Sequence, residues 1–421
     1  MAVAAEGPTF DFPTFNSNSG LNKTRRQPLE RAKRLDKIPP YLFGEIARLK
    51  AKAIAEGRDL VDLGIGDPDR PTPQPIIDRL CEAANDPETH RYDETEAGWP
   101  PFLEAAARWY KRRFDVDIDP NGEAMLLLGS KDGLAHLCWA MIDPGDISLV
   151  PDPGYTVYKV NTMMAGGDIV QMPLLEENGF VPDLSAIPTD AAQKAKLMFL
   201  NYPNNPTGAT ASLEFFQDAV RFAKDHDIAI CSDLAYSEVT YDGYVAPSML
   251  QAEGAKDVVI EMHSLSKTMN MTGWRIGFAV GNKDLISHLN KLKSNLDSRQ
   301  FPAIDLAAAY ALDHVSNQAT RDLYRKRRDI LVDGLNAIGW RITKPKASLY
   351  VWAKVPSGYT SADFAKMLLQ DAGVLVIPGN GYGQYGEGYV RMSLTVAGDR
   401  DGERVAEAVK RIADAGIRWD G

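Results

Sequence analysis

The sequence predicts an α/β protein in which a mostly parallel sheet, covered by helices, is accompanied by a smaller α+β lobe. Three observations predict this class. Short apolar runs alternate with helical patterns through the middle of the chain, as in proteins with parallel strands and covering helices. Several of these runs lack two-residue alternation, which is typical of strands buried on both faces. After about residue 305 the pattern changes to helices mixed with short strands.

Seven apolar runs are the candidate strands of the large sheet. Turn signals separate them, among them Asp143–Asp146 and Pro203–Pro206. The sequence therefore predicts a seven-stranded sheet built from Met125–Leu128, Ile147–Val150, Ile169–Met172, Leu197–Leu200, Ile228–Cys231, Val258–Met262 and Ile276–Val280.

The smaller lobe is predicted from segments at both ends of the chain. Helical patterns cover Tyr41 to about Glu56, Ala319–Ile338 and Gly402–Ala415, and short strands are expected near Leu349–Ala353 and Tyr389–Leu394. We therefore expect residues 1–35 to form a flexible tail and arm, residues 66–304 a large domain, and residues 36–65 with 305–421 a small domain.

Composition and charge exclude several classes of function. The 421 residues carry a net charge of −10, whereas a nucleic-acid-binding protein normally has a basic excess. The three cysteines form no CxxC pair, so neither a disulfide framework nor a metal site is expected. No apolar run approaches the ~20 residues of a membrane span, and the first residues lack the apolar core of a signal peptide. We expect a cytoplasmic protein that acts on small molecules.

A lysine follows one of the predicted strands. Ser264, Ser266 and Lys267 stand at the end of that strand, and Arg275 lies eight residues beyond the lysine. Burial there would lower the lysine pKa, and a neutral amine can condense with an aldehyde. The two hydroxyls and the arginine could hold a phosphate beside it. Taken alone, the motif is more typical of a solvated surface lysine.

A carboxylate follows the preceding strand. Asp233 could pair with a protonated pyridine nitrogen, and Tyr236 could reach a phenolate oxygen on the same ring. The alternative is a helix N-cap and a packing tyrosine.

Other polar groups stand at further strand ends. Asn204–Gly208 must turn sharply and could project an asparagine into a cleft, or simply turn. Gly129–Lys131 begins a helix whose free N–H groups suit an anion. Tyr155 could stack on a planar ligand or pack, and Arg391, on an alternating strand, is either paired or binds a carboxylate. Since ligands bind at the carboxyl edge of an open α/β sheet, these groups are expected to meet there.

Together, these motifs resemble class I/II aminotransferases of fold type I, which use pyridoxal 5′-phosphate (PLP). The resemblance covers about residues 35–415 and rests on Asn204–Gly208, Ser232–Tyr236, Ser264–Gly277 and Arg391. Further stretches look like LL-diaminopimelate aminotransferases of bacteria and archaea, namely Pro39–Phe43, Asp62–Asp69, Ala107–Phe114, Gly129–His136 and Val150–Tyr155.

The resemblance implies roles around the cofactor ring. Lys267 would hold the cofactor covalently and later move a proton at the substrate's Cα. Asp233 would keep the pyridine nitrogen protonated, Asn205 and Tyr236 would bind the ring oxygen, and Tyr155 would stack on the ring.

The resemblance also implies the phosphate and substrate contacts. The phosphate would be held by Ser130, Lys131, Ser264, Ser266 and Arg275, joined by Tyr92 from a neighbouring subunit. Arg391 would bind the α-carboxylate, assisted by Gly66 and Asn205. Because Tyr92 would cross an interface, the resemblance implies a homodimer with shared active sites, in which the arm before residue 45 wraps the partner.

The resemblance implies a transaminase acting on an amino acid and a 2-oxo acid, in its best-matching form LL-2,6-diaminopimelate and 2-oxoglutarate in lysine biosynthesis. Arg299 departs from this subgroup, where small residues usually stand, and could bind a distal carboxylate or the phosphate, or be solvated. Met269 and Thr156 are also unusual. Alternatives are an alanine, aspartate or aromatic aminotransferase, a PLP-dependent lyase or oxidase, and a non-catalytic PLP-binding regulator, for which the N-terminal segment lacks a helix-turn-helix pattern.

Overall fold

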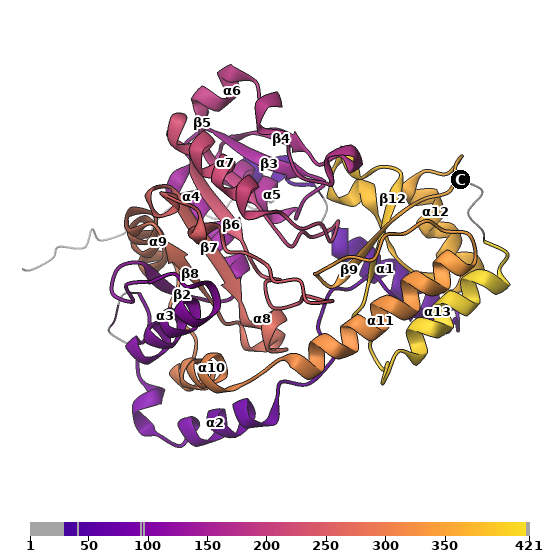
Figure 1. Ribbon diagram of the computed structural model, residues 1–421, viewed down its shortest axis with the longest axis horizontal. Helices are drawn as coiled ribbons and strands as arrows, with labels where there is room; N and C mark the ends of the chain where they lie inside the picture. The colour runs from indigo at the N-terminus through magenta and orange to yellow at the C-terminus, as the bar shows by residue number, and fades with distance from the viewer. Residues whose placement is uncertain (1–28, 40–41, 93–94, 96, 418–421) are drawn as a thin grey trace, which may run out of the picture.

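The computed structural model describes residues 29–39, 42–92, 95 and 97–417, and it has two lobes (Figure 1). The large lobe contains the seven-stranded sheet, and the small lobe lies beside it (right in Figure 1). Most of the predicted N-terminal tail, residues 1–28, lies outside the described residues. Of the arm, the described part contains one short 3-10 helix, Lys33–Lys37.

The large sheet confirms the predicted seven strands. Its spatial order is β2-β8-β7-β6-β5-β3-β4, and β8 alone runs antiparallel to its neighbours. The carboxyl ends of the other six strands therefore meet at one edge of the sheet. The strands are β2 (Ala124–Leu127), β3 (Ile147–Asp152), β4 (Asp168–Pro173), β5 (Ala195–Leu200), β6 (Ala229–Asp233), β7 (Val259–Ser264) and β8 (Gly277–Gly281).

Helices cover both faces of this sheet, which explains the absence of alternation in its strands. Neighbouring residues on β5 show this directly, since Leu197 and Met198 belong to two different apolar clusters. The helices of this lobe are α2 (Gln74–Ala84), α3 (Pro100–Phe114), α4 (Ser130–Met141), α5 (Val157–Ala165), α6 (Thr189–Lys194), α7 (Leu213–Asp225), α8 (Leu265–Thr268), α9 (Lys283–Leu296) and α10 (Pro302–His314).

The helix ends follow the local sequence. Ser212 caps α7 by accepting a hydrogen bond from the Phe215 N–H, and Asn282 caps α9 in the same way through the Leu285 N–H. Pro302 stands in the first turn of α10, where its missing N–H costs no helical hydrogen bond. Helix α10 packs against α2 and α3 within the large lobe's apolar cluster. We therefore propose that the domain boundary lies closer to residue 314 than to the predicted residue 305.

In the described part of the chain, the small lobe combines an antiparallel sheet, a two-stranded parallel sheet and α-helices (Figure 1). The antiparallel sheet has the order β11-β12-β9, and β1 pairs with β10. The elements are α1 (Leu42–Ala55), β1 (Val61–Asp62), α11 (Gln318–Ala337), β9 (Tyr350–Lys354), α12 (Ser361–Met367), β10 (Val374–Leu375), β11 (Ile377–Pro378), β12 (Tyr389–Ser393) and α13 (Glu403–Asp414).

A buried arginine on α11 joins the small lobe to the segment that follows β1. The Arg327 guanidinium donates to both carboxylate oxygens of Asp69 at 2.7 and 2.8 Å, to Asp399 Oδ2 at 2.6 Å and to the Leu394 carbonyl at 3.0 Å. Its side chain is fully buried. Such a charge is tolerated inside a protein only when it is paired and hydrogen-bonded, as it is here.

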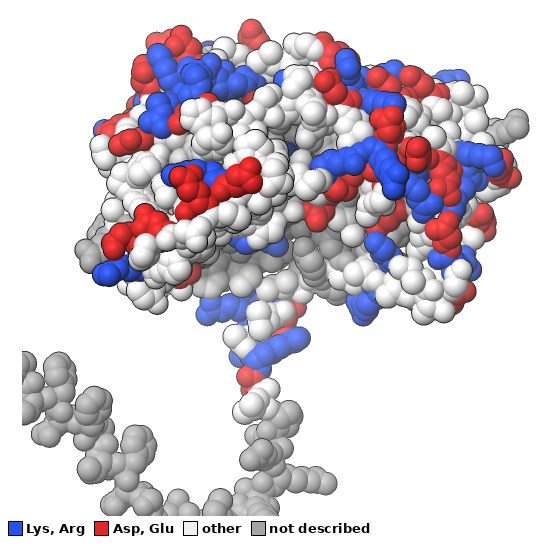
Figure 2. All heavy atoms as spheres, turned by 90° about the horizontal axis from the view of Figure 1, so that it is seen from below, with Lys and Arg blue, Asp and Glu red and all other residues white. Residues whose placement is uncertain are grey.

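The surface carries both signs of charge. Figure 2 shows one face, on which Lys and Arg side chains occur together with Asp and Glu side chains over both lobes. Within the described ranges, no helix is long and apolar enough to cross a membrane.

Candidate active site

A cavity of about 640 Å³ opens at the carboxyl edge of the large sheet and is closed on one side by α1. It collects residues from segments far apart in the sequence. Ten of the predicted site residues line it: Gly66, Ser130, Lys131, Tyr155, Asn205, Asp233, Tyr236, Ser264, Lys267 and Arg391. A smaller adjoining cavity shares Ser130, Lys131 and Lys267 with it and adds Ser266 and Arg275.

Lys267 enters the cavity from α8, directly after β7. Its Nζ donates a 2.6 Å hydrogen bond to the Gly66 carbonyl. Burial lowers the pKa of this lysine, while nearby Tyr350 and Asp67 act in the opposite direction. The neutral amine, which is the nucleophilic form, is therefore more accessible than for a surface lysine.

Asp233 stands at the end of β6 with only one of its carboxylate oxygens satisfied by a side chain. Oδ2 accepts a 2.8 Å hydrogen bond from the Tyr158 hydroxyl, and Oδ1 is buried with no hydrogen-bond partner among the described residues. Burial raises the pKa of Asp233 to about 6, against the opposing effect of Tyr158. A cationic N–H donor at Oδ1 would satisfy this oxygen and stabilise the ionised carboxylate.

Arg391 projects from β12 and is almost fully buried. Its Nη1 donates to Asn205 Oδ1 at 2.9 Å, and its Nη2 donates to the Gly64 carbonyl at 2.6 Å. The guanidinium carbon lies 4.0 Å from the centre of the Tyr350 ring, so the guanidinium packs over the face of that ring. A planar guanidinium held in this way matches a carboxylate.

Asn201, which was not predicted as a site residue, links two of the predicted groups. Its Oδ1 accepts the Asn205 N–H at 2.8 Å, and its Nδ2 donates to the Asp233 carbonyl at 2.7 Å. Asn201 therefore fixes the turn that carries Asn205 relative to the end of β6.

A positively charged turn forms the floor of the adjoining cavity. Gly129 precedes α4 with φ 83°, a conformation that strains larger residues, and a Cβ there would stand 2.4 Å from Arg275 Nη2 and displace that side chain. Arg275 donates to the Leu128 carbonyl at 3.1 Å. Burial and the nearby Arg275 lower the pKa of Lys131. The N-terminus of α4, Lys131 and Arg275 together suit an anion such as a phosphate.

Two tyrosines complete the wall of the main cavity. The hydroxyl groups of Tyr236 and Tyr350 lie 3.0 Å apart. Burial, followed by the neighbouring Tyr350, raises the pKa of Tyr236, so its hydroxyl is kept protonated and can donate to a ligand oxygen. Tyr155 is half-buried at the cavity edge and contacts Tyr158 edge-on, with ring centres 5.7 Å apart.

Tyr92 and Arg299 are the two predicted site residues that line neither the main cavity nor the adjoining one. Both line a second cavity of about 590 Å³, formed largely by residues 89–92, 95 and 297–302. Arg299 Nη1 donates to Thr95 Oγ1 at 2.9 Å. Tyr92 is 88% exposed, so most of its surface is available to another molecule.

Comparison with known proteins identifies the family. The family model described as aminotransferase class I and II matches residues 58–412. The chain belongs to the class I and II aminotransferases. An LL-diaminopimelate aminotransferase of Moorella thermoacetica is 53% identical over 91% of this chain and 98% of its own length. A second one, from a Nostoc species, is 52% identical over 92% and 99%. The structure of substrate-bound BacF from Bacillus subtilis covers 94% of the chain and all of its own, with a TM-score of 0.89 and 37% identity.

This aminotransferase is a PLP-dependent enzyme of fold type I, and the chemistry of its donor set fits PLP. The buried, unsatisfied Asp233 Oδ1 matches a protonated ring nitrogen. The Lys267 amine matches the aldehyde, and the turn at Gly129–Lys131 matches the phosphate.

Sequence reasoning missed Asn201, Tyr158 and Tyr350 in this aminotransferase. Tyr158 follows Tyr155 by three residues, a spacing that places both on one side of a helical turn and could have pointed to it. Tyr350 lies on β9 beside β12, and no local signal connects it to Asn205 or Lys267.

Proposed function

We propose that this aminotransferase transfers an amino group from LL-2,6-diaminopimelate to 2-oxoglutarate, a reaction of lysine biosynthesis. The observation that carries the proposal is its identity of 53% and 52% with two LL-diaminopimelate aminotransferases over more than nine-tenths of the chain. The site supports it, because Arg391 offers a carboxylate-binding guanidinium in the same cavity as the Lys267 amine.

Each site residue has a proposed task in binding the reactants. Arg391 binds the α-carboxylate of either substrate through two parallel N–H groups, and Asn205 orients that guanidinium. Ser130, Lys131, Ser264, Ser266 and Arg275 hold the phosphate of PLP, and Tyr155 covers its ring.

The remaining residues are proposed to handle protons. When bound, PLP accepts the electron pair that is released as the Cα–H bond breaks. Asp233 keeps a proton on the ring nitrogen, and Tyr236 donates a hydrogen bond to the ring oxygen together with Asn205. Lys267, freed once the substrate is bound, takes the proton from Cα and would then deliver it to C4′ of the cofactor, because its lowered pKa suits both uptake and release of a proton.

We also propose a cytoplasmic homodimer with shared active sites. Tyr92 and Arg299 would then enter the partner's main cavity, where Tyr92 joins the phosphate contacts and Arg299 binds the distal carboxylate of a dicarboxylic substrate. The exposure of Tyr92 and the position of both residues at one second cavity support this arrangement.

A single-turnover spectral experiment tests the substrate. The PLP-loaded enzyme is mixed separately with LL-diaminopimelate, glutamate, aspartate, alanine, phenylalanine and arginine, and conversion of bound PLP to pyridoxamine phosphate is followed by absorbance. Only LL-diaminopimelate and glutamate are expected to convert the cofactor fully, and 2-oxoglutarate should reverse the change. Full conversion by another amino acid with none by LL-diaminopimelate would move the assignment to that amino acid. A change in the absorbance of bound PLP without formation of pyridoxamine phosphate would instead favour a lyase or oxidase.

A further inference from the structure

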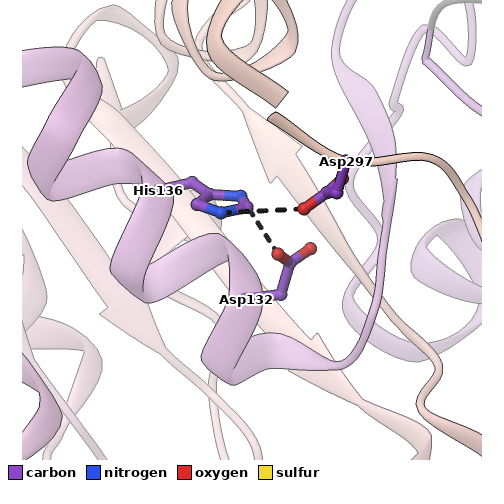
Figure 3. Close-up of side chains that lie close together, drawn as sticks. All are labelled: Asp132, His136 and Asp297. Carbon is purple, nitrogen blue, oxygen red and sulfur yellow. Dashed lines mark ion pairs between the residues drawn. The ribbon is translucent and has the colours of Figure 1, made fainter. Parts of the chain in front are cut away.

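A partly buried ionic cluster lies next to the proposed phosphate-binding turn but outside the main cavity. Figure 3 shows Asp132 and His136 on α4 facing Asp297, the residue that follows α9. Lys293, in the last turn of α9, donates to Asp132 Oδ2 at 2.8 Å and to Asp297 Oδ1 at 2.5 Å. The Lys293 side chain is only 4% exposed, whereas its partners Asp132 and Asp297 are 10% and 27% exposed.

This cluster resembles a metal site in its ligand types, but Lys293 already supplies the cation. His136 Nδ1 lies 3.0 Å from Asp132 Oδ1, and its Nε2 lies 3.7 Å from Asp297 Oδ2. A metal ion bound between the two carboxylates would have to displace the ammonium group that now bridges them. The cluster is therefore a closed ionic link between α4 and the end of α9.

One side of the link holds the phosphate-binding turn. Asp132 Oδ2 accepts the Leu128 N–H at 3.0 Å, and the Leu128 carbonyl accepts from Arg275 Nη2 at 3.1 Å. Burial opposes ionisation of Asp132, yet hydrogen bonds from His136 and Lys293 lower its pKa to about 2. Asp132 is therefore a fixed anion that holds the backbone directly before Gly129.

The other side holds the loop that carries Arg299. The Asp297 N–H donates to the Lys293 carbonyl at 3.1 Å, and its carboxylate is tied to the Lys293 ammonium. Lys293 and residues 297–302 also line the second cavity, together with Tyr92. The ammonium group of Lys293 therefore contacts both Asp132 and the first residue of the loop that carries Arg299.

We propose that Lys293 is a positioning residue that couples occupancy of the phosphate-binding turn to the order of the loop Asp297–Phe301. The inference rests on the proposed phosphate contacts at Ser130 and Arg275. Coupling of this kind is reciprocal. An anion that orders the turn must therefore also order the loop, and loss of the link must weaken binding of the anion.

Hydrogen exchange of the full-length enzyme, with and without PLP, tests the coupling. In the wild type, PLP is expected to slow exchange in peptides covering both residues 128–133 and residues 297–301. In Lys293→Met, PLP should protect residues 128–133 alone, and the PLP dissociation constant should rise by about tenfold. Lys291→Met removes an exposed charge two residues away on the same helix and should match the wild type in both respects.

Asp297→Asn is a milder second variant, because it keeps the side-chain shape and removes one charge from the link. It should lower PLP-dependent protection of residues 297–301 and raise the PLP dissociation constant by about threefold. If either variant loses thermal stability while PLP still protects both segments, the coupling is refuted and Lys293 only stabilises the fold. If PLP fails to protect residues 128–133 in the wild type, the proposed phosphate site itself is wrong.

Discussion

The main cavity and the second cavity, which Tyr92 and Arg299 line, differ in how the structure positions their residues. In the main cavity, Asp233 ends β6, Lys267 lies on the short helix α8 directly after β7, and Arg391 lies on β12. In the second cavity, Arg299 lies on a connection between two helices, and Tyr92 is almost entirely exposed. The groups proposed to act on the bound substrate and cofactor are thus positioned by strands or strand ends, whereas the two groups proposed to be shared with a second subunit lie outside the sheets.

The largest effect is expected from substitution of Lys267 in the main cavity. Lys267→Ala should reduce transamination by about 10⁴-fold or more, because the proton at Cα then has no positioned base. Steady-state kinetics measure the loss, and borohydride reduction followed by peptide mapping locates the PLP attachment. Attachment at another lysine in this variant would show that Lys267 is not the covalent site.

Arg391→Lys should lower kcat/KM by roughly several hundredfold, because an ammonium group cannot make two parallel hydrogen bonds to a carboxylate. The loss should be similar for the amino acid and the 2-oxo acid, since both present an α-carboxylate. Stopped-flow measurement of both half-reactions checks this. A loss confined to one half-reaction would contradict a shared carboxylate site.

The raised pKa of Asp233 gives a pH dependence to the apoenzyme. Its folded-state pKa of about 6 exceeds the ordinary value of 3.8, so the folded state holds the proton more tightly than the unfolded chain does. The resulting stability is present below about pH 4 and is lost as pH rises through about 6, by up to about 3 kcal/mol. Asp233→Asn removes this titration.

The measurement is denaturant unfolding of both apoproteins from pH 4 to pH 7. The unfolding free energy of the wild type should fall relative to that of Asp233→Asn as pH rises. Adding PLP should reverse the difference, because a protonated ring nitrogen stabilises the ionised carboxylate. A constant difference across this range would mean that Asp233 is already ionised at pH 4.

The smallest effect is expected in the second cavity. Arg299→Ala should raise KM about tenfold for LL-diaminopimelate and 2-oxoglutarate, with little change for alanine, since only the dicarboxylic substrates reach a distal cation. Mixed dimers sharpen the comparison. Combining Lys267→Ala subunits with Arg299→Ala subunits should restore one native site per dimer, and no recovery of affinity would contradict sharing of the two cavities.

The strands and the residues at their ends could be predicted from the sequence more fully than the rest of the molecule. The seven strands were predicted to within two residues at most ends, because strands buried on both faces are continuous apolar runs. Their carboxyl ends then brought Lys267, Asp233 and Asn205 together without further information. The buried face of helix α11 was harder to predict. Its inward face includes Arg327 and Arg328, and a periodicity analysis assigns arginine to the surface.

What could not be predicted depends on long-range contacts. Tyr350 supports Arg391 across two strands that are adjacent in space but separated by dozens of residues in the chain. Lys293 was unremarkable in the sequence, because nothing local distinguishes a buried bridging lysine from the exposed Lys291 on the same helix.

The buried Arg327 has a consequence for anyone who redesigns this enzyme. It joins α11 to Asp69, three residues beyond the glycine whose carbonyl receives Lys267. Exchange of the segment around Gly66 for one without an acidic residue at position 69 would leave the buried Arg327 without one of its two carboxylate partners, at a cost of about 3–5 kcal/mol. The substrate-facing segment and the long helix are thus a single transplantable unit, and chimeras should be cut outside both.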